Sequence, residues 1–232
     1  MHHSESSMKV GVDGVLIGAW GNVKGRRGLD VGTGCGLIAL MAAQRNPFAI
    51  IEAVDIHPGS VKEANKNFAL SPWSENLIAY ECDAFSDPFL PSRCNCFDFI
   101  LSNPPFFCSG INNPISDREK ARHQSVLSPE ALLRFSYITL KYGGTLSFIT
   151  TTEEEYENLI SKALEYNLFI ERLCLIADKP DKKSKRVMLS FRKLQKQVAF
   201  DLSRKDKLFI RNTDGSYSER YRQLTSEFYL NF

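Results

Sequence analysis

Short apolar runs alternate along residues 28–193 with stretches whose apolar positions recur at helical spacing. The runs predicted to be strands are 28–32, 50–55, 77–83, 97–103, 145–150, 168–177 and 187–193. The segments predicted to be helices are 37–43, 58–70, 128–141 and 153–166. Strands separated by helices indicate a parallel sheet covered on both faces, so we expect an α/β fold with a Rossmann-like, doubly wound, seven-stranded sheet.

Cap and turn residues support these boundaries. Ser128 is a suitable N-cap, and Gly143 with Gly144 is expected to end that helix before the next strand. The last two predicted strands have no helix between them, so the final strand is expected to run antiparallel. The remaining segments are a long loop predicted at 107–127 and a last extended pair predicted at 207–211 and 217–232.

The composition of the 232 residues, 43% hydrophobic and 24% charged, is ordinary for a globular protein and excludes a disordered, collagenous or coiled-coil chain. No apolar run approaches the length of a membrane helix, and the start lacks a signal-peptide pattern. We therefore expect a cytoplasmic monomer without membrane contact. The six cysteines are scattered except for Cys94 and Cys96, with no histidine at ligand spacing, which favours reduced packing thiols over a metal site.

Charge is unevenly distributed along the chain. Residues 179–222 contain 14 Lys and Arg against 5 Asp and Glu, whereas the rest contains 15 against 22. A basic C-terminal part on a mildly acidic body is typical of a surface that faces phosphates, although lysines are also common on solvated loops and strand edges. The sequence therefore predicts a nucleic-acid partner as one of two open interpretations.

A glycine-rich turn, Gly32-Thr33-Gly34-Cys35-Gly36, follows the first strand and opens the first helix of this region. A dinucleotide-binding turn usually spaces its glycines G-x-G-x-x-G, so the G-x-G-x-G spacing here argues for a ligand without a pyrophosphate. Asp55 ends the second strand and is predicted to accept hydrogen bonds from ribose hydroxyls. Asp83 ends the third strand and is predicted either to accept from an adenine amino group or to be a loop charge.

An adenosine ligand without a pyrophosphate on this fold suggests S-adenosyl-L-methionine. The residues expected to bind this cofactor are Asp30, Gly32, Thr33, Gly34, Gly36, Asp55, Ile56, Asp83, Ala84 and Asn103.

The fourth strand runs into Asn103-Pro104-Pro105-Phe106, at the end where open α/β sheets bind ligands. An aryl or amide nitrogen holds its lone pair in conjugation. Two acceptors, the Asn103 side-chain oxygen and the Pro104 carbonyl, are predicted to draw such an amine toward a tetrahedral shape that can attack a methyl group. Phe106 is predicted to stack an unpaired base. The expected catalytic residues are Asn103, Pro104, Pro105 and Phe106.

These motifs resemble class I adenosylmethionine-dependent methyltransferases that act on planar amines. Four further segments make the chain similar to the bacterial tRNA(Val) adenine-N(6)-methyltransferase family, and the similarity covers about residues 8–232. The segments are Met8 to Trp20, Ser71-Pro72-Trp73, Arg118 with Ala121-Arg122-His123, and Tyr217 to Leu230. Members of that family usually carry a longer N-terminal segment, so residues 1–27 are expected to be a shortened N-terminal segment ahead of a methyltransferase domain at 28–232.

The resemblance implies a substrate and its contacts: methyl transfer to N6 of the adenosine 3′ of the anticodon in tRNA. It also places Lys9 and Asp13 near the cofactor entrance, although Val12, Val15, Leu16 and Trp20 equally allow a packed helix. The residues expected to contact RNA are Lys9, Arg118, Arg122, His123, Lys182, Lys183, Lys185 and Arg186.

The same catalytic turn leaves other functions open. A glutamine-amide N(5)-methyltransferase of release factors shares it, but normally has a helical N-terminal domain for which 27 residues are too few. An rRNA guanine-N(2)-methyltransferase also shares it. A non-catalytic RNA-binding protein with a decayed cofactor pocket is disfavoured by the intact Gly32, Asp55 and Asn103, and a dinucleotide oxidoreductase is disfavoured by the glycine spacing.

Overall fold

The computed structural model describes residues 11–85, 91–104, 127–151, 153–195 and 205–230. Within these ranges one sheet of eight strands has the order β3-β2-β1-β4-β5-β7-β6-β8. The strands are β1 (Arg27–Val31), β2 (Ile50–Asp55), β3 (Leu77–Glu81), β4 (Phe97–Ser102), β5 (Leu140–Thr151), β6 (Leu168–Ala177), β7 (Arg186–Lys193) and β8 (Asp206–Phe209).

The direction of the strands confirms the expected doubly wound, mostly parallel sheet. Strands β3, β2, β1, β4 and β5 run parallel to one another, and β7 runs antiparallel to both β5 and β6, as expected for two strands joined without a helix. The expected count of seven strands is wrong, because β8 adds to the outer edge of β6 in a parallel register. Seven of the eight strands therefore point the same way.

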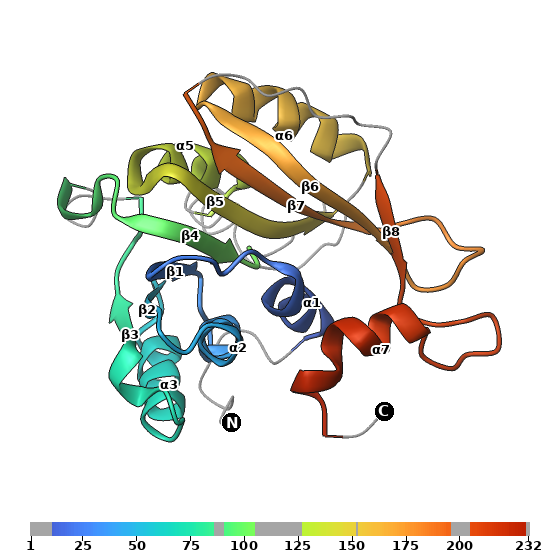
Figure 1. The fold of residues 1–232 in the computed structure, drawn as a ribbon, viewed down its shortest axis with the longest axis horizontal. Coiled ribbons are helices and arrows are strands. Elements are labelled where there is room, and N and C mark those ends of the chain that lie inside the picture. Colours follow the sequence, from blue (N-terminus) through green and yellow to red (C-terminus); the bar gives the residue numbers. More distant parts are fainter. Residues whose placement is uncertain (1–10, 86–90, 105–126, 152, 196–204, 231–232) are drawn as a thin grey trace, which may run out of the picture.

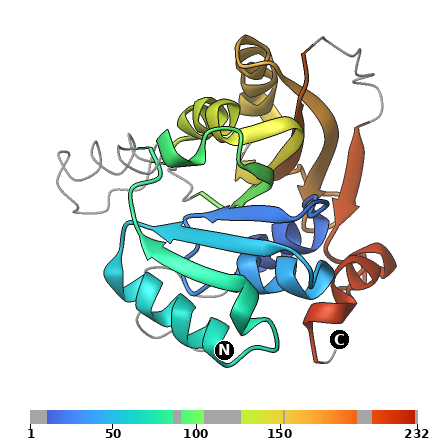
Figure 2. The same ribbon diagram turned by 60° about the vertical axis from the view of Figure 1, so that its left-hand side comes forward.

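Helices cover both faces of this sheet (Figures 1 and 2). The helices α1 (Val12–Trp20), α2 (Leu37–Arg45), α3 (Pro58–Ala69) and α7 (Glu219–Thr225) lie on one face, and α5 (Pro129–Thr139) and α6 (Glu153–Glu165) lie on the other. Three short 3-10 helices occupy Ser74–Asn76, Pro91–Arg93 and Ser226–Phe228. None of the helices in the described ranges is long and apolar enough to cross a membrane.

The C-terminal tail is helical, so the expectation of an extended segment at 217–232 is wrong. Ser218 caps helix α7, because its hydroxyl oxygen accepts a hydrogen bond from the Tyr221 amide at 3.1 Å. Tyr221 is buried, and Leu224 and Phe228 pack against a cluster formed by α1 and α2. Tyr221, Leu224 and Phe228 are three and four positions apart, which is helical spacing. The many aromatic residues of the tail favour a strand prediction instead.

Residues 12–20 form a packed helix, one of the two interpretations left open by the sequence. Leu16 and Ile17 are fully buried and join the same core as α2 and α3, whereas Val12 is exposed. Helix α1 therefore contributes side chains to the same hydrophobic core as α2 and α3.

Strand β5 begins earlier than predicted. The preceding helix ends at Thr139 rather than at residue 141, because the fully buried Leu140 pairs with Phe97 of β4. The two glycines lie inside the strand, where the β4–β5 register shifts, and Gly143 takes a φ of +81°. Glycine at this position permits an irregularity that the sequence predicts as a helix end.

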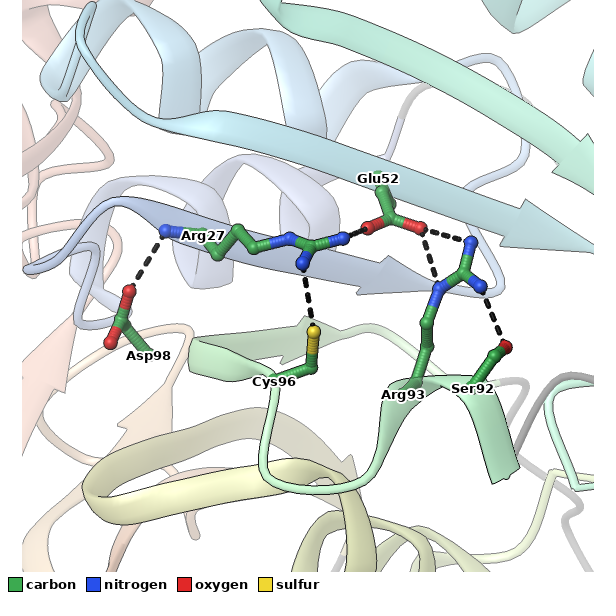
Figure 3. Close-up of polar contacts among 6 residues, drawn as sticks. All are labelled: Arg27, Glu52, Ser92, Arg93, Cys96 and Asp98. Carbon is green, nitrogen blue, oxygen red and sulfur yellow. Dashed lines mark hydrogen bonds and ion pairs between the residues drawn. The ribbon is translucent and has the colours of Figure 1, made fainter.

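A cluster of charged side chains connects β1, β2 and β4 near the amino-terminal ends of these strands (Figure 3). This is the edge of the sheet opposite to the one where ligands are expected. The buried Glu52 of β2 accepts from Arg27 at 2.6 Å and from Arg93 at 2.9 Å. Arg27 also reaches the Cys96 sulfur at 2.9 Å, and its amide donates to Asp98 of β4 at 2.9 Å. The buried carboxylate therefore has both oxygens paired, and the segment before β4 is tied to β2.

Candidate functional site

The carboxyl ends of β1, β2, β3 and β4 meet at one edge of the sheet, because these strands are parallel. All cofactor-binding and catalytic positions predicted from the sequence that lie in the described ranges stand near the ends of these four strands or directly after them. Pro105 and Phe106 lie outside the described residues, as do Lys9, Arg118, Arg122, His123 and the Cys108 thiol.

The glycine turn is fastened to the neighbouring strand by its backbone. The amides of Gly32 and Thr33 both donate to the Val54 carbonyl of β2, at 2.9 and 3.0 Å. Gly34 has a φ of +54°, and a Cβ placed on it would meet no atom within 4 Å. Gly36 has a φ of +84°, and a Cβ there would lie 2.5 Å from the ring of Phe68. Gly36 is thus required for packing on α3, whereas Gly34 presents bare backbone to open space.

Asp55, at the end of β2, holds this turn. Its Oδ2 accepts from the Gly34 amide at 2.9 Å, and its Oδ1 accepts from the His57 amide at 2.9 Å. Its side chain is buried, and the adjacent Ile56 is partly exposed. A carboxylate oxygen can accept more than one hydrogen bond, so Asp55 retains acceptor capacity for ribose hydroxyls. The sequence did not predict the hydrogen bond between Asp55 and Gly34, because binding of a ribose is already enough to account for an aspartate at this position.

Asp30, in β1, lies beneath the turn. Its Oδ2 accepts from the Thr33 hydroxyl at 2.6 Å and from the Ala39 amide of α2 at 3.1 Å, whereas its Oδ1 is buried without a hydrogen-bond partner in the described ranges. Burial raises the pKa of Asp30 to about 7, against the lowering effect of the two hydrogen bonds. The side chain therefore joins strand, turn and helix and keeps one free acceptor.

We expect Asp30 to make the free energy of unfolding depend on pH. The folded-state pKa of about 7 exceeds the ordinary 3.8, so this group stabilises the fold in its protonated form, and that contribution falls as pH rises from about 4 to 7. In Asp30→Asn this dependence should disappear. Urea unfolding of both proteins at several pH values measures it: the difference between them should change by up to about 1.4 kcal/mol per pH unit, and parallel curves would contradict the assignment.

The end of β3 lies beside Asp55. The Cys82 amide donates to the Asp55 carbonyl at 3.0 Å, and the Asp83 carboxylate accepts from the Phe85 amide at 3.0 Å. Ala84 is buried within the core on the α5 face. The structure thus brings Asp83 next to Asp55 and places the Ala84 side chain in the packing.

Asn103 follows β4 at the same edge. The preceding Ser102 donates from its buried hydroxyl to the Val31 carbonyl at 2.8 Å, which aligns the ends of β4 and β1. The Oδ1 of Asn103 is buried and has no hydrogen-bond partner among the described residues. A Cβ added to Gly14 of α1 would lie 4.0 Å from Asn103 Nδ2, so the first turn of α1 forms one wall of this corner. Pro104 is buried.

The basic turn between β6 and β7 lies at the same edge. Because β7 runs antiparallel to both β5 and β6, β6 has the direction of β4 and β5, and the turn after β6 leaves the sheet at the edge that carries the ends of β1 and β4. Strands β5 and β7 lie between β4 and β6 in the sheet. Lys182, Lys183 and Lys185 are exposed. Arg186 instead donates from Nε to the Asp13 carboxylate of α1 at 2.7 Å. Sequence reasoning missed this pair, since the two residues are 173 positions apart.

Three features fit a bound adenosylmethionine. Gly34 offers open backbone, Asp55 offers carboxylate oxygens for a ribose, and Asp30 carries a buried oxygen without a partner in the described ranges. A ligand with a ribose and a cationic group matches such a set of acceptors and brings no phosphate. No group of three or more His, Cys, Asp and Glu in the described ranges is placed to hold a metal.

The fold and this site define a class I methyltransferase. The methyltransferase small domain model matches residues 13–172. The chain is 39% identical to a tRNA1(Val) (adenine(37)-N6)-methyltransferase of Vibrio campbellii, over 99% of this chain and 92% of the relative, and 37% identical to one of Bacteroides thetaiotaomicron, over 98% and 93%. The chain belongs to the tRNA1(Val) (adenine(37)-N6)-methyltransferase family within the small-domain methyltransferases, which confirms the expected adenosylmethionine-dependent methyltransferase.

Solved structures agree with the fold. A predicted O-methyltransferase from Agrobacterium tumefaciens has a TM-score of 0.69 at 17% identity, and the match covers 93% of this chain and 96% of that one. This likeness concerns the fold alone.

Proposed function

We propose that this chain transfers a methyl group from S-adenosyl-L-methionine to N6 of adenine 37 in tRNA1(Val). The observation that carries the proposal is the Oδ1 of Asn103 at the carboxyl end of β4, which is buried and has no hydrogen-bond partner among the residues that the structure describes. The chain also matches the relatives of that name over nearly its full length. A buried acceptor without a partner costs free energy, so its retention indicates a donor that arrives with a ligand.

Asn103 and Pro104 act on the target amine. The exocyclic nitrogen of adenine holds its lone pair in conjugation with the ring and is a weak nucleophile. Asn103 Oδ1 and the Pro104 carbonyl oxygen each accept a hydrogen bond from one N–H of this amine, which favours a tetrahedral nitrogen with an available lone pair. Bound adenosylmethionine would supply a methyl group on a sulfonium: as the N–C bond forms, the C–S bond would break and S-adenosylhomocysteine would leave. The methylated nitrogen would be cationic and would lose one proton to water, so no strong base is needed. Pro105 fixes the backbone of this turn and Phe106 stacks the adenine.

The cofactor residues divide by role. The backbone of Gly32 and Gly34 with Thr33 and Gly36 shapes the turn, Asp55 accepts from the ribose, and Asp83 lies beside it for the adenine amino group. Asp30 keeps the turn on α2 and offers its free oxygen to a cationic group of the methionine moiety. Ile56 contributes apolar surface near the adenine, and Ala84 supports the chain after β3 by packing into the core.

The tRNA backbone lies on the basic turn in this proposal. Lys182, Lys183 and Lys185 are exposed at the edge that carries Asn103, so phosphates near the anticodon can meet them while the target base enters the corner. Exposed lysines at a nucleic-acid surface make affinity depend steeply on salt. Binding should therefore weaken as salt rises, and replacement of one of these lysines by alanine should reduce the salt slope by about one.

The decisive test uses labelled adenosylmethionine and unmodified tRNA1(Val) transcript. We expect label in N6-methyladenosine at position 37, and none in a transcript that carries guanosine at 37. Release-factor protein and rRNA, offered in parallel, separate the alternative amine substrates, because both present a planar nitrogen to the same turn. Label in either of these, with none in the transcript, would overturn the proposal.

A further inference from the structure

The ion pair between Asp13 and Arg186 joins the basic turn to the catalytic corner. Arg186 is the first residue of β7 and pairs in register with Thr151 of β5 and Ile176 of β6, so two neighbouring strands fix its backbone. Its Nε lies 2.7 Å from both carboxylate oxygens of Asp13. The side chain of Asp13 is 14% exposed and that of Arg186 is 38% exposed, so water screens the pair only in part.

The first turn of α1 depends on this pair more than the rest of the helix does. The helix is buried from Gly14 to Trp20, whereas Val12 is exposed. Arg172 holds the end of the helix, because its guanidinium lies 4.1 Å above the Trp20 ring and donates to the Trp20 carbonyl at 3.0 Å. The N-cap Gly11 offers no side-chain cap, and the Val15 amide reaches the Gly11 carbonyl at 3.3 Å. Apolar packing therefore secures the body of α1, and Arg186 supplies the charged contact of its first turn in the described ranges.

This first turn lies beside Asn103. Gly14 follows Asp13 directly, and a Cβ on Gly14 would lie 4.0 Å from Asn103 Nδ2 and 3.2 Å from Leu37 at the start of α2. The amide of Asn103 must be oriented so that Oδ1, and not Nδ2, faces the target amine. The first turn of α1 lies on the Nδ2 side of this carboxamide, so a shift of that turn gives the carboxamide more room to rotate.

We propose that Asp13 and Arg186 are positioning residues that hold the first turn of α1 against Asn103 and thereby keep its Oδ1 aimed at the target amine. Arg186 then serves the reaction through Asp13 and not as a phosphate contact, in contrast to the three exposed lysines of the same turn. The kinetic test of this inference rests on the proposed function. The structural test, by hydrogen exchange, does not depend on it.

The structural readout is amide hydrogen exchange. We compare the full-length protein with Asp13→Ala, Arg186→Ala, the double alanine variant and the charge-exchanged variant D13R/R186D. Exchange at Val15 and Leu16 should be at least tenfold faster in each alanine variant and slower again in the charge-exchanged one. Arg192→Ala is the matched control, because Arg192 pairs with Glu171 at the far end of the same strand. Unchanged exchange in both single variants would overturn the inference, whether or not tRNA is methylated.

The kinetic readout separates positioning from RNA contact. Each single alanine variant should lower kcat about tenfold, with the KM for tRNA within about twofold and with the double variant no worse than either single one. Arg192→Ala should keep the wild-type kcat. If Arg186→Ala raises KM and lowers the salt slope by about one while Asp13→Ala has wild-type kcat, then Arg186 is a phosphate contact and the inference is wrong. If the wild-type protein methylates no tRNA, the proposed function fails and hydrogen exchange alone decides this inference.

Discussion

Asn103→Ala should lower kcat for tRNA methylation by roughly 100- to 1000-fold, the loss typical when one preorganised polar contact to the reacting centre is removed. The reason is the buried Oδ1, which has no partner in the described part of the chain and so is available to the target amine. Removal of the carboxamide leaves the Pro104 carbonyl as the one acceptor of the proposed pair. Single-turnover methylation of tRNA1(Val) transcript measures the loss.

The affinity for adenosylmethionine should change little in this variant, because Gly34, Asp55 and Asp30 remain in place. Calorimetry with the cofactor checks this. Asn76→Ala is the matched control, because it removes the same carboxamide at the amino-terminal end of β3, away from the site. The Asn76 carboxamide donates to the Pro47 carbonyl at 2.9 Å. A variant at position 103 that keeps most of its rate would show that the amine is polarised elsewhere.

The parallel part of the fold could be predicted from sequence, because each strand there is a compact apolar run followed by a helix with its own cap or glycine. The strand ends at Asp55 and Asn103 were found for the same reason, since a polar residue directly after a buried strand must lie at the ligand edge. Periodicity and turn chemistry are local signals, and they suffice where neighbours in space are also neighbours in the pattern.

The features that could not be predicted depend on contacts between distant residues. The extended segment predicted at 207–211 is present as β8, but its place at the free edge of β6 could not be predicted. Helix α7 is helical because Tyr221 and Leu224 pack on α1 and α2, more than 170 positions earlier. The pairing of Asp13 with Arg186 also joins distant residues, and so does the placement of Gly14 beside Asn103. Tertiary contacts decide such details, and a single sequence contains no local record of them.

Alanine at two glycines of the same turn should lower the free energy of unfolding to different degrees. Gly36→Ala should lower the free energy of unfolding by about 2–5 kcal/mol, because the residue has a left-handed φ of +84°, which costs about 1–2 kcal/mol for an L-residue, and because its Cβ would lie 2.5 Å from the Phe68 ring, an overlap that costs about 1–3 kcal/mol more. Gly34→Ala should lose only the conformational part, since its Cβ meets nothing within 4 Å. Urea unfolding without ligand measures both.

The order should reverse for the cofactor. The open space over Gly34 is where we expect the cofactor to approach the backbone, so a methyl group there should weaken adenosylmethionine binding about 10- to 100-fold, equivalent to an overlap of about 1–3 kcal/mol. The folded fraction of Gly36→Ala should bind closer to normally, because its Cβ points at α3 and not at that space. Calorimetric titration of the two variants, each corrected for its folded fraction, compares them. Equal affinity in Gly34→Ala and wild type would place the cofactor away from the glycine turn and remove the basis on which Asn103 is assigned to the reacting centre.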